Sequence, residues 1–131
     1  MTTLVFHNGH VLTERGFERD TCVVVEDGHI VAVLHGDAPA GDERIDLQDR
    51  YLAPGFIDVQ VNGGGGVLFN NDTSVAGIDA IGRAHRKFGT TGFLPTLISD
   101  DADVMQRAIA ATRDAIAGGV PGVLGIHLEG P

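Results

Sequence analysis

The second half of the sequence alternates between short apolar runs and longer amphipathic runs, and this alternation limits the possible folds more than any other feature. Residues 56–61, 91–98 and 123–128 are mainly apolar and predict strands. Residues 74–88 and 99–117 carry apolar side chains at helical spacing and predict amphipathic helices. Strands that alternate with helices in this way indicate a parallel sheet with crossover helices.

Polar residues and glycines mark the ends of both predicted helices. Asp72 or Thr73 can cap the start of the first helix, and Gly89 is in place as its stop. One of residues 99–101 can cap the second helix, and the glycine pair at 118–119 ends it. Each crossover helix therefore has a defined beginning and end.

Residues 1–53 have a different pattern, that of short strands joined by tight turns. Asn-Gly at residues 8–9 and Asp-Gly at residues 27–28 are hairpin signals. Residues 30–34 are apolar at odd and even positions alike, so we expect this strand to be buried on both faces. Residues 45–47 alternate apolar and charged side chains and predict a short edge strand.

Proline and glycine at residues 54–55 separate these two patterns. We therefore expect an all-β domain over residues 1–53 and a βαβαβ segment over residues 54–131. The order of elements alone fits either a doubly wound sheet or a barrel. A complete (β/α)8 barrel needs about 250 residues, whereas 78 residues follow Ala53, so a barrel would be less than half present.

Period-two alternation sorts the side chains of two predicted strands into faces. One face of the first strand carries Phe56, Asp58, Gln60 and Asn62. Its other face carries Ile57, Val59 and Val61, which we expect to pack under the helices. In the third strand one face carries Val123, Gly125, His127 and Glu129. Because active sites of parallel α/β proteins lie at the C-terminal ends of strands, the candidate site residues are Gln60, Asn62, His127 and Glu129.

Each candidate also has a purely structural explanation. Glu129 can be a solvated loop carboxylate, and His127 can be a core histidine bonded to the backbone rather than a ligand. Gln60 and Asn62 can be ordinary polar caps of a barrel interior. The glycines at 63–66 can cradle a phosphate, but they lack the Lys-Ser/Thr of a P-loop and are better explained as a flexible turn. The remaining histidines show no metal-ligand spacing and are interpreted as surface or hairpin residues: His7, His10, His29, His35 and His85.

Charge and cysteine content exclude several classes of protein. The net charge of -9 argues against a nucleic-acid binder, which would carry a basic patch. A phosphorylated substrate remains possible, because one arginine or one helix N-terminus can hold a phosphate. Cys22 is the only cysteine, which rules out an intramolecular disulfide and fits a reducing compartment. The sequence has no recognisable signal peptide and no apolar run of membrane-spanning length, so we expect a cytoplasmic protein without a membrane partner.

Three segments resemble one enzyme family. Residues 54–63, PGFIDVQVNG, resemble the first-strand signature of the amidohydrolase superfamily, which usually reads Gly-x-Ile-Asp-x-His-x-His. Residues 89–96, GTTGFLPT, and residues 125–131, GIHLEGP, are similar to the next two strand segments of the N-acetylglucosamine-6-phosphate deacetylases. The resemblance implies the first strands of a (β/α)8 TIM-type barrel, preceded over residues 1–53 by part of a small β-sandwich domain.

The resemblance also implies a metal site. It makes Glu129 the metal-binding glutamate of the third strand. Gln60 and Asn62 replace the two histidines of the usual signature, and amide side chains are poor ligands for a zinc-like ion. The family form with this replacement uses a single divalent metal ion, zinc or another, and Gln60 would hydrogen-bond the metal-bound water or the substrate. Asn62 and His127 would lie near the site.

The implied reaction is hydrolysis of N-acetylglucosamine 6-phosphate to glucosamine 6-phosphate and acetate in amino-sugar catabolism. In the family the histidine ligands, the general-base aspartate and most phosphate-binding groups come from later strands, which these residues do not include. The full-length protein is expected to be a homodimer. The alternatives are another amidohydrolase, such as an N-acetylgalactosamine-6-phosphate deacetylase, and a non-catalytic truncated fragment.

We predict that the 131-residue chain by itself is inactive and poorly soluble or molten, because both domains would lack part of their cores. Near-UV circular dichroism and thermal unfolding measure this, and a sharp cooperative melt with a near-UV signal would contradict the prediction. The intact mass of the protein from its native source tests whether these residues are part of a longer chain. A mass several-fold above that of these residues would identify a longer enzyme.

Overall fold

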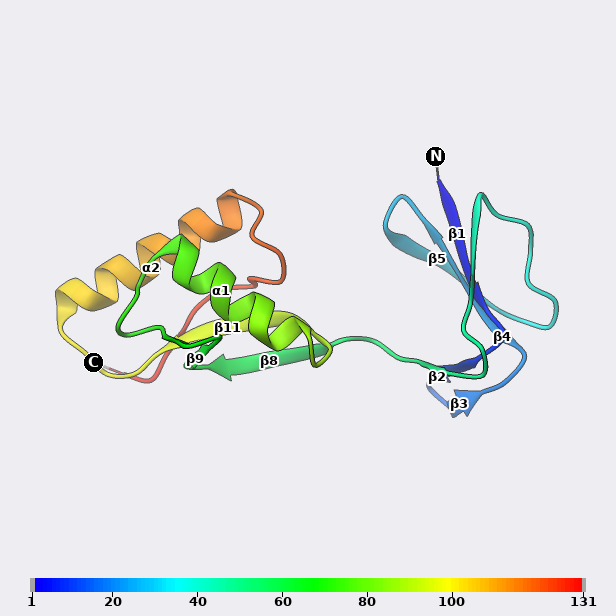
Figure 1. Ribbon diagram of the computed structural model, residues 1–131, viewed down its shortest axis with the longest axis horizontal. Coiled ribbons are helices and arrows are strands. Elements are labelled where there is room, and N and C mark those ends of the chain that lie inside the picture. The colour runs from blue at the N-terminus through cyan, green and yellow to red at the C-terminus, as the bar shows by residue number, and fades with distance from the viewer. Residues whose placement is uncertain (1, 131) are drawn as a thin grey trace. The chain divides into compact units, whose positions relative to one another are not determined.

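The computed structural model describes residues 2–130, and its contacts divide it after Pro54 into two compact units, each described on its own (Figure 1). Met1 and Pro131, the outer ends of the two domains predicted from the sequence, lie outside the described residues. Strands occur in both units, and the helices of the described chain lie in the second, so the fold is of the α/β class. No helix within residues 2–130 is long and apolar enough to cross a membrane.

Two small sheets form the first unit. The larger sheet has the order β5, β4, β1, β6, which are His29–His35, Thr21–Glu26, Thr3–His7 and Glu43–Asp46. β1 runs antiparallel to β4 and parallel to β6, and β4 runs antiparallel to β5. In the smaller sheet β2 lies between β3 and β7, and these strands are His10–Thr13, Gly16–Glu18 and Tyr51–Leu52. Val5, Cys22 and Val24 form a buried cluster on the larger sheet.

The two turn signals of this unit lead to different structures. Asp27 and Gly28 form the two-residue loop of the β4–β5 hairpin, and both have positive φ, 47° and 82°, as this tight turn requires. Asn8 also has a positive φ of 58°, but the strands on either side of it belong to different sheets. A Cβ at Gly9 would lie 2.6 Å from Cβ of Leu47, so the chain passes close to that residue. The Asn-Gly signal therefore predicted a turn correctly and a hairpin wrongly.

β5 is exposed, which contradicts the expectation that it is buried on both faces. The exposed fractions of Ile30, Val31, Val33 and Leu34 are 68%, 51%, 47% and 42%. Within residues 2–130 β5 is an edge strand that pairs only with β4, and the other strands of this unit leave its side chains uncovered. The opposite edge of the sheet is β6, in agreement with the edge strand predicted around residues 45–47.

The second unit contains a three-stranded parallel sheet in the order β12, β11, β8. The strands of this sheet and the two helices follow in the order β8 (Phe56–Val61), α1 (Val75–Arg86), β11 (Thr90–Leu97), α2 (Ala102–Ala117) and β12 (His127–Leu128), with a short hairpin between β8 and α1. The predicted alternation of strands and helices is confirmed. The third strand is shorter than predicted, with one bridge between Val123 and Phe93 and regular pairing only from His127. In the described chain only β11 flanks this segment, so it is hydrogen-bonded along one side.

Helix α1 begins at a cap that the sequence analysis did not select. Oγ of Ser74 accepts a hydrogen bond from a backbone N–H of the first turn at 3.0 Å, whereas Asp72 and Thr73 precede the cap. Gly89 has a φ of 94° and follows the C-cap by two residues, so it turns the chain into β11 rather than ending the helix itself. Asp101 is the N-cap of α2, one of its three predicted candidates.

The two helices pack against each other and against β11 (Figure 1). The core beneath them consists of Val61, Phe69, Ile78, Ile81, Phe93, Leu97, Ala108, Ala111, Ala115 and Val123. Ile57 and Val59 of β8 are 66% and 62% exposed, so the expectation that they pack under the helices is wrong. Only Val61 of that face reaches the core, because β8 is one of the two edge strands and the helices pack mainly against β11, the middle strand.

Two phenylalanines of the second unit provide a matched test of this core. Phe93 is 2% exposed and Phe88 is 81% exposed. We expect Phe93→Ala to lower the free energy of unfolding by about 3–5 kcal/mol, because it leaves a cavity, and Phe88→Ala to lower it by less than about 0.5 kcal/mol. Urea denaturation of both variants of the full-length natural protein measures the difference, and equal losses would contradict the assigned core.

Candidate functional site

The candidate site lies at the C-terminal ends of the strands of the second unit. Nε2 of Gln60 donates to Oε1 of Glu129 at 2.9 Å, and Nδ2 of Asn62 donates to the same oxygen at 3.1 Å. The backbone N–H of Glu129 donates to the carbonyl oxygen of Leu97 at 3.0 Å, which anchors this residue beside the end of β11. Three of the four predicted site residues therefore meet. Within residues 2–130 no hydrogen bond engages Oε2 of Glu129, which leaves this oxygen available to a further ligand.

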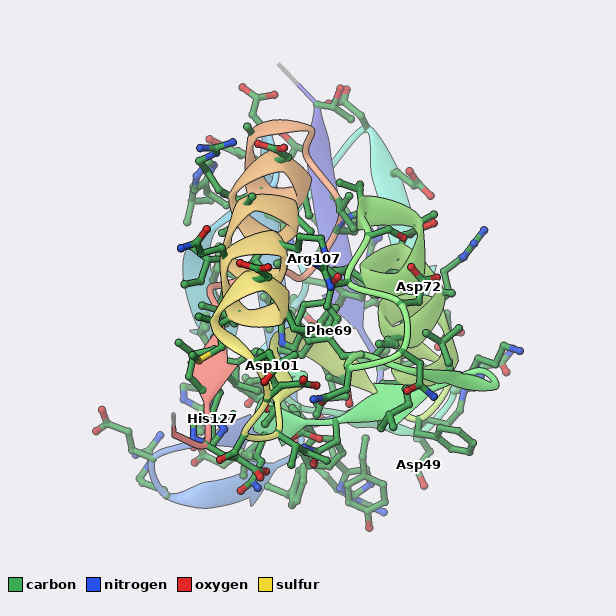
Figure 2. The ribbon with its side chains drawn as sticks, turned by 90° about the vertical axis from the view of Figure 1, so that its left-hand side faces the viewer. Asp49, Phe69, Asp72, Asp101, Arg107 and His127 are labelled. Atoms are coloured by element: carbon green, nitrogen blue, oxygen red, sulfur yellow. The ribbon has the colours of Figure 1, made fainter. Side chains whose placement is uncertain are left out.

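His127, the fourth candidate, does not join the hydrogen bonds to Glu129. It lies on β12 (Figure 2). Its side chain is half-buried, and its Nδ1 lies 3.3 Å from Oγ1 of Thr96. The hydrogen-bond partner is thus a side chain and not the backbone group that the core-histidine explanation assumed. In the structure His127 connects β12 to β11.

An irregularity in β8 sets the direction of Gln60. Asp58 stands opposite Phe93 and Val61 stands opposite Pro95, so β8 carries one extra residue between these two positions. Such a β-bulge bends the strand and changes where its side chains point. Period-two alternation cannot predict a bulge. Pro95 was the available signal, because proline inside a sheet is found at bulges and edges.

Thr96 is the residue of this region that the sequence analysis missed. It is fully buried, and its Oγ1 accepts a hydrogen bond from the N–H of Val61 at 2.9 Å and donates one to the carbonyl oxygen of Leu94 at 3.2 Å. The Thr96 hydroxyl has His127 as its third partner. When the His127 ring donates from Nδ1, the hydroxyl donates its one proton to Leu94 and accepts at both of its lone pairs. The signal in the sequence was a single hydroxyl within the apolar run of residues 93–98.

The glycine run after β8 forms a packed turn. Two short strands, β9 (Gly63–Gly64) and β10 (Val67–Leu68), pair antiparallel, and the two glycines between them have φ of 62° and 84°. Nε2 of His85 lies 2.9 Å from the carbonyl oxygen of Gly63, and a Cβ at Gly64 would lie 2.9 Å from the same ring. His85 is half-buried rather than on the surface as predicted. A Cβ at Gly63 would clash with the carbonyl oxygen of Val67 in β10, and a Cβ at Gly64 would meet His85 of α1, so packing accounts for both glycines.

Asn70 ties the loop after β8 to the segment after β11. Its Oδ1 accepts from the N–H of Ile98 at 3.0 Å, and its Nδ2 donates to the carbonyl oxygen of Ile98 at 3.0 Å and to Oδ2 of Asp100 at 2.8 Å. The hydrogen bond from Asn70, and after it the one from the N–H of Asp101, hold the pKa of Asp100 below its ordinary value, with a contribution from the charge of Arg107. The two loops beside the candidate site are therefore held together.

The metal-binding capacity of this region is partial. Residues 2–130 contain no group of three or more His, Cys, Asp or Glu side chains placed to hold a metal ion. Glu129 is the only side chain of a metal-ligating type among the three that meet at the strand ends. A catalytic zinc ion uses about three protein ligands, so this cluster fits one ligand of such a site and not the whole site.

The chain is similar to sugar-phosphate deacetylases over nearly its whole length. It is 40% identical to an N-acetylgalactosamine-6-phosphate deacetylase of Shewanella sp. (strain ANA-3), over 98% of this chain and 33% of that protein. It is 36% identical to an N-acetylglucosamine-6-phosphate deacetylase of Haemophilus influenzae, over 92% of this chain and 32% of that protein. The crystal structure of an N-acetylglucosamine-6-phosphate deacetylase from Pasteurella multocida matches with a TM-score of 0.91 and 36% identity, over 98% of this chain and 34% of that chain. No family model matches.

These comparisons confirm the resemblance that the three strand motifs indicated. The chain spans about a third of the length of the curated relatives it matches. Its α/β fold, with the mixed sheet of the first unit and the parallel sheet of the second, matches part of the larger fold of these enzymes.

The contact between Asn70 and Asp100 can be tested by titration. Asn70→Ala should raise the pKa of Asp100, because it removes the largest of the interactions that lower this pKa. Since the folded-state pKa is depressed, the interaction stabilises the fold above the unfolded-state pKa and is lost as the pH falls through the folded-state value. Carbon-13 NMR of the Asp100 carboxyl group measures its pKa in the wild-type protein and in the variant. Asn71→Ala is the control, and an equal rise in both variants would contradict the assignment.

Proposed function

We propose that the protein containing this chain is a metal-dependent amidohydrolase that converts N-acetylglucosamine 6-phosphate to glucosamine 6-phosphate and acetate. The observation that carries the proposal is the pair of hydrogen bonds from Gln60 and Asn62 to one carboxylate oxygen of Glu129. These residues lie at the carboxyl ends of parallel strands, which is where α/β enzymes hold their catalytic groups. The relatives from Haemophilus influenzae and Pasteurella multocida are named as deacetylases of this sugar phosphate.

In this proposal Glu129 is a ligand of one divalent metal ion, zinc being the ion that best fits a carboxylate combined with histidines. The two amides hold Oε1, which leaves Oε2 for the ion. When bound, such an ion polarises the amide carbonyl of a substrate and lowers the pKa of a bound water. Gln60 and Asn62 stand where a second metal ion would need two histidines, and their amide groups favour a single-metal site.

Gln60 has a second function in this proposal. Its side-chain amide has two N–H donors, and one of them is used on Glu129. The other can donate to the attacking water or to the substrate's carbonyl oxygen. Gln60 would therefore link the position of the reacting groups to the position of the metal ligand.

The other parts of the site would come from residues outside these 131. Two histidine ligands would complete the metal site, and an aspartate would act as general base and then protonate the leaving amine. Most of the groups that hold the sugar phosphate would come from the same part of the protein. We therefore propose that the isolated chain does not catalyse the reaction.

The proposal includes the architecture and setting of the longer protein. β8, β11 and β12 with their two helices would be the beginning of a (β/α)8 barrel, and the two sheets of the first unit would be part of a small β-sandwich domain. The full-length protein would be a homodimer in the cytoplasm, where the unpaired, buried thiol of Cys22 is kept reduced. Its partner would be a small phosphorylated amino sugar and neither nucleic acid nor membrane.

N-acetylgalactosamine 6-phosphate is the second candidate substrate. The Shewanella relative is named for it and is 40% identical to this chain. The two sugars differ in the orientation of one hydroxyl group, so the active site can distinguish them through a single hydrogen-bonding contact. Both sugar phosphates should therefore be compared in the same activity assay.

Acetate release by the full-length natural protein, measured with both sugar phosphates, tests this function. We expect hydrolysis with the higher kcat/KM for N-acetylglucosamine 6-phosphate. Glu129→Gln should lower kcat/KM by about 100-fold or more and reduce the bound metal, because changes to partners of metal ligands already cost about 10- to 100-fold. Glu43→Gln, at an exposed position of β6, is the control. Full activity of Glu129→Gln, or no acetate from either sugar, would refute the proposal.

A further inference from the structure

Two backbone N–H groups at the bulge of β8 are bound by side-chain oxygens. The N–H of Gln60 donates to Oδ1 of Asp58 at 3.1 Å, and the N–H of Val61 donates to Oγ1 of Thr96 at 2.9 Å. Pro95 stands opposite Val61 and has no N–H of its own to offer to a neighbouring strand. The backbone at this point is therefore held by two side chains in addition to the regular pairing of the sheet.

The residues that these side chains hold are the ones that reach Glu129. Gln60 lies inside the bulge, and Asn62 follows directly after Val61. Both donate to Oε1 of Glu129, at 2.9 Å and 3.1 Å. Because these two distances depend on the path of the backbone from residue 60 to residue 62, a shift of Val61 moves both donors together.

The same hydroxyl contacts β12, the strand that ends directly before Glu129. Oγ1 of Thr96 lies 3.3 Å from Nδ1 of His127, two residues before Glu129. Thr96 is on β11, the middle strand of the sheet, and it is fully buried. One hydroxyl on the central strand therefore contacts both outer strands close to the points where their side chains meet.

We propose that Thr96 is a positioning residue of the site, and that its hydroxyl holds the bulge which aims Gln60 and Asn62 at Glu129. An unpaired N–H in a buried place is costly, and Val61 is 3% exposed, so loss of the hydroxyl would drive the backbone of Val61 toward another arrangement. Thr96 acts through Val61, since its hydroxyl makes no hydrogen bond with Gln60 or Glu129 within the described residues. The role in catalysis rests on the function proposed above.

Thr96→Val in the full-length natural protein is the test, because valine keeps the shape and removes the hydroxyl. We expect kcat to fall by about 10- to 100-fold, since a misplacement of about 1 Å can cost about 100-fold, while KM changes less than about threefold because the sugar-phosphate contacts remain. Thr96→Ser restores the hydroxyl and should bring kcat back to within about threefold. Hydrogen exchange of the Val61 amide should become about tenfold faster in Thr96→Val and not in Thr96→Ser.

Thr112→Val is the matched control. Thr112 is also buried, at 2% exposure, but its hydroxyl donates to the carbonyl oxygen of Ala108 within α2, away from the candidate site. We expect this variant to lose thermal stability and to keep the wild-type kcat. A kcat of Thr96→Val within about twofold of wild type would overturn the proposal, as would equal losses of kcat in Thr96→Val and Thr112→Val.

A crystal structure of Thr96→Val separates this proposal from the proposed function. The wild-type distance between Nε2 of Gln60 and Oε1 of Glu129 is 2.9 Å, and we expect this hydrogen bond to be broken in the variant. If the wild-type protein releases no acetate, the proposed function fails, and the crystal structure alone decides whether Thr96 positions these side chains. An unchanged hydrogen bond in the variant would overturn the positioning role in either case.

Discussion

The pairing of β8 and β12 on opposite sides of β11 is the constraint on which the candidate site depends. Gln60 and Asn62 belong to one outer strand and its end, and Glu129 follows the other outer strand. They meet because both outer strands are in register with the same central strand, whose side chains Phe93 and Leu97 are buried under the helices. The apolar core thus fixes the sheet, and the sheet fixes the distance between the polar groups at its edge.

The elements that could be predicted from the sequence are those whose signal is local and repeated. The apolar periodicity of α1 and α2 extends over several turns, and β8 and β11 are long enough to be recognised between glycines. The strands β3, β7, β9 and β10 have two or three residues each, too few to produce a pattern. The exposure of β5 could not be predicted, because an apolar strand has the same sequence pattern whether or not another layer covers it.

The candidate site could also be predicted only in part. Gln60, Asn62 and Glu129 were selected because polar residues at the C-terminal ends of parallel strands converge, and the structure brings them together. Thr96 was missed, because its partners are set by the register of three strands and not by its neighbours in sequence. The bulge was missed for the same reason, although Pro95 in a middle strand indicated an irregularity.

The packing of Gly64 against His85 couples substitutions at these two positions. A methyl group at position 64 would lie 2.9 Å from the His85 ring, so a side chain there requires the ring to move or a smaller residue at position 85. A movement or a replacement of His85 would in turn disturb its contact with the carbonyl oxygen of Gly63. Substitutions at the two positions are therefore expected to have non-additive effects on stability, whichever comes first. This epistasis gives the turn after β8 few accessible routes to a new sequence.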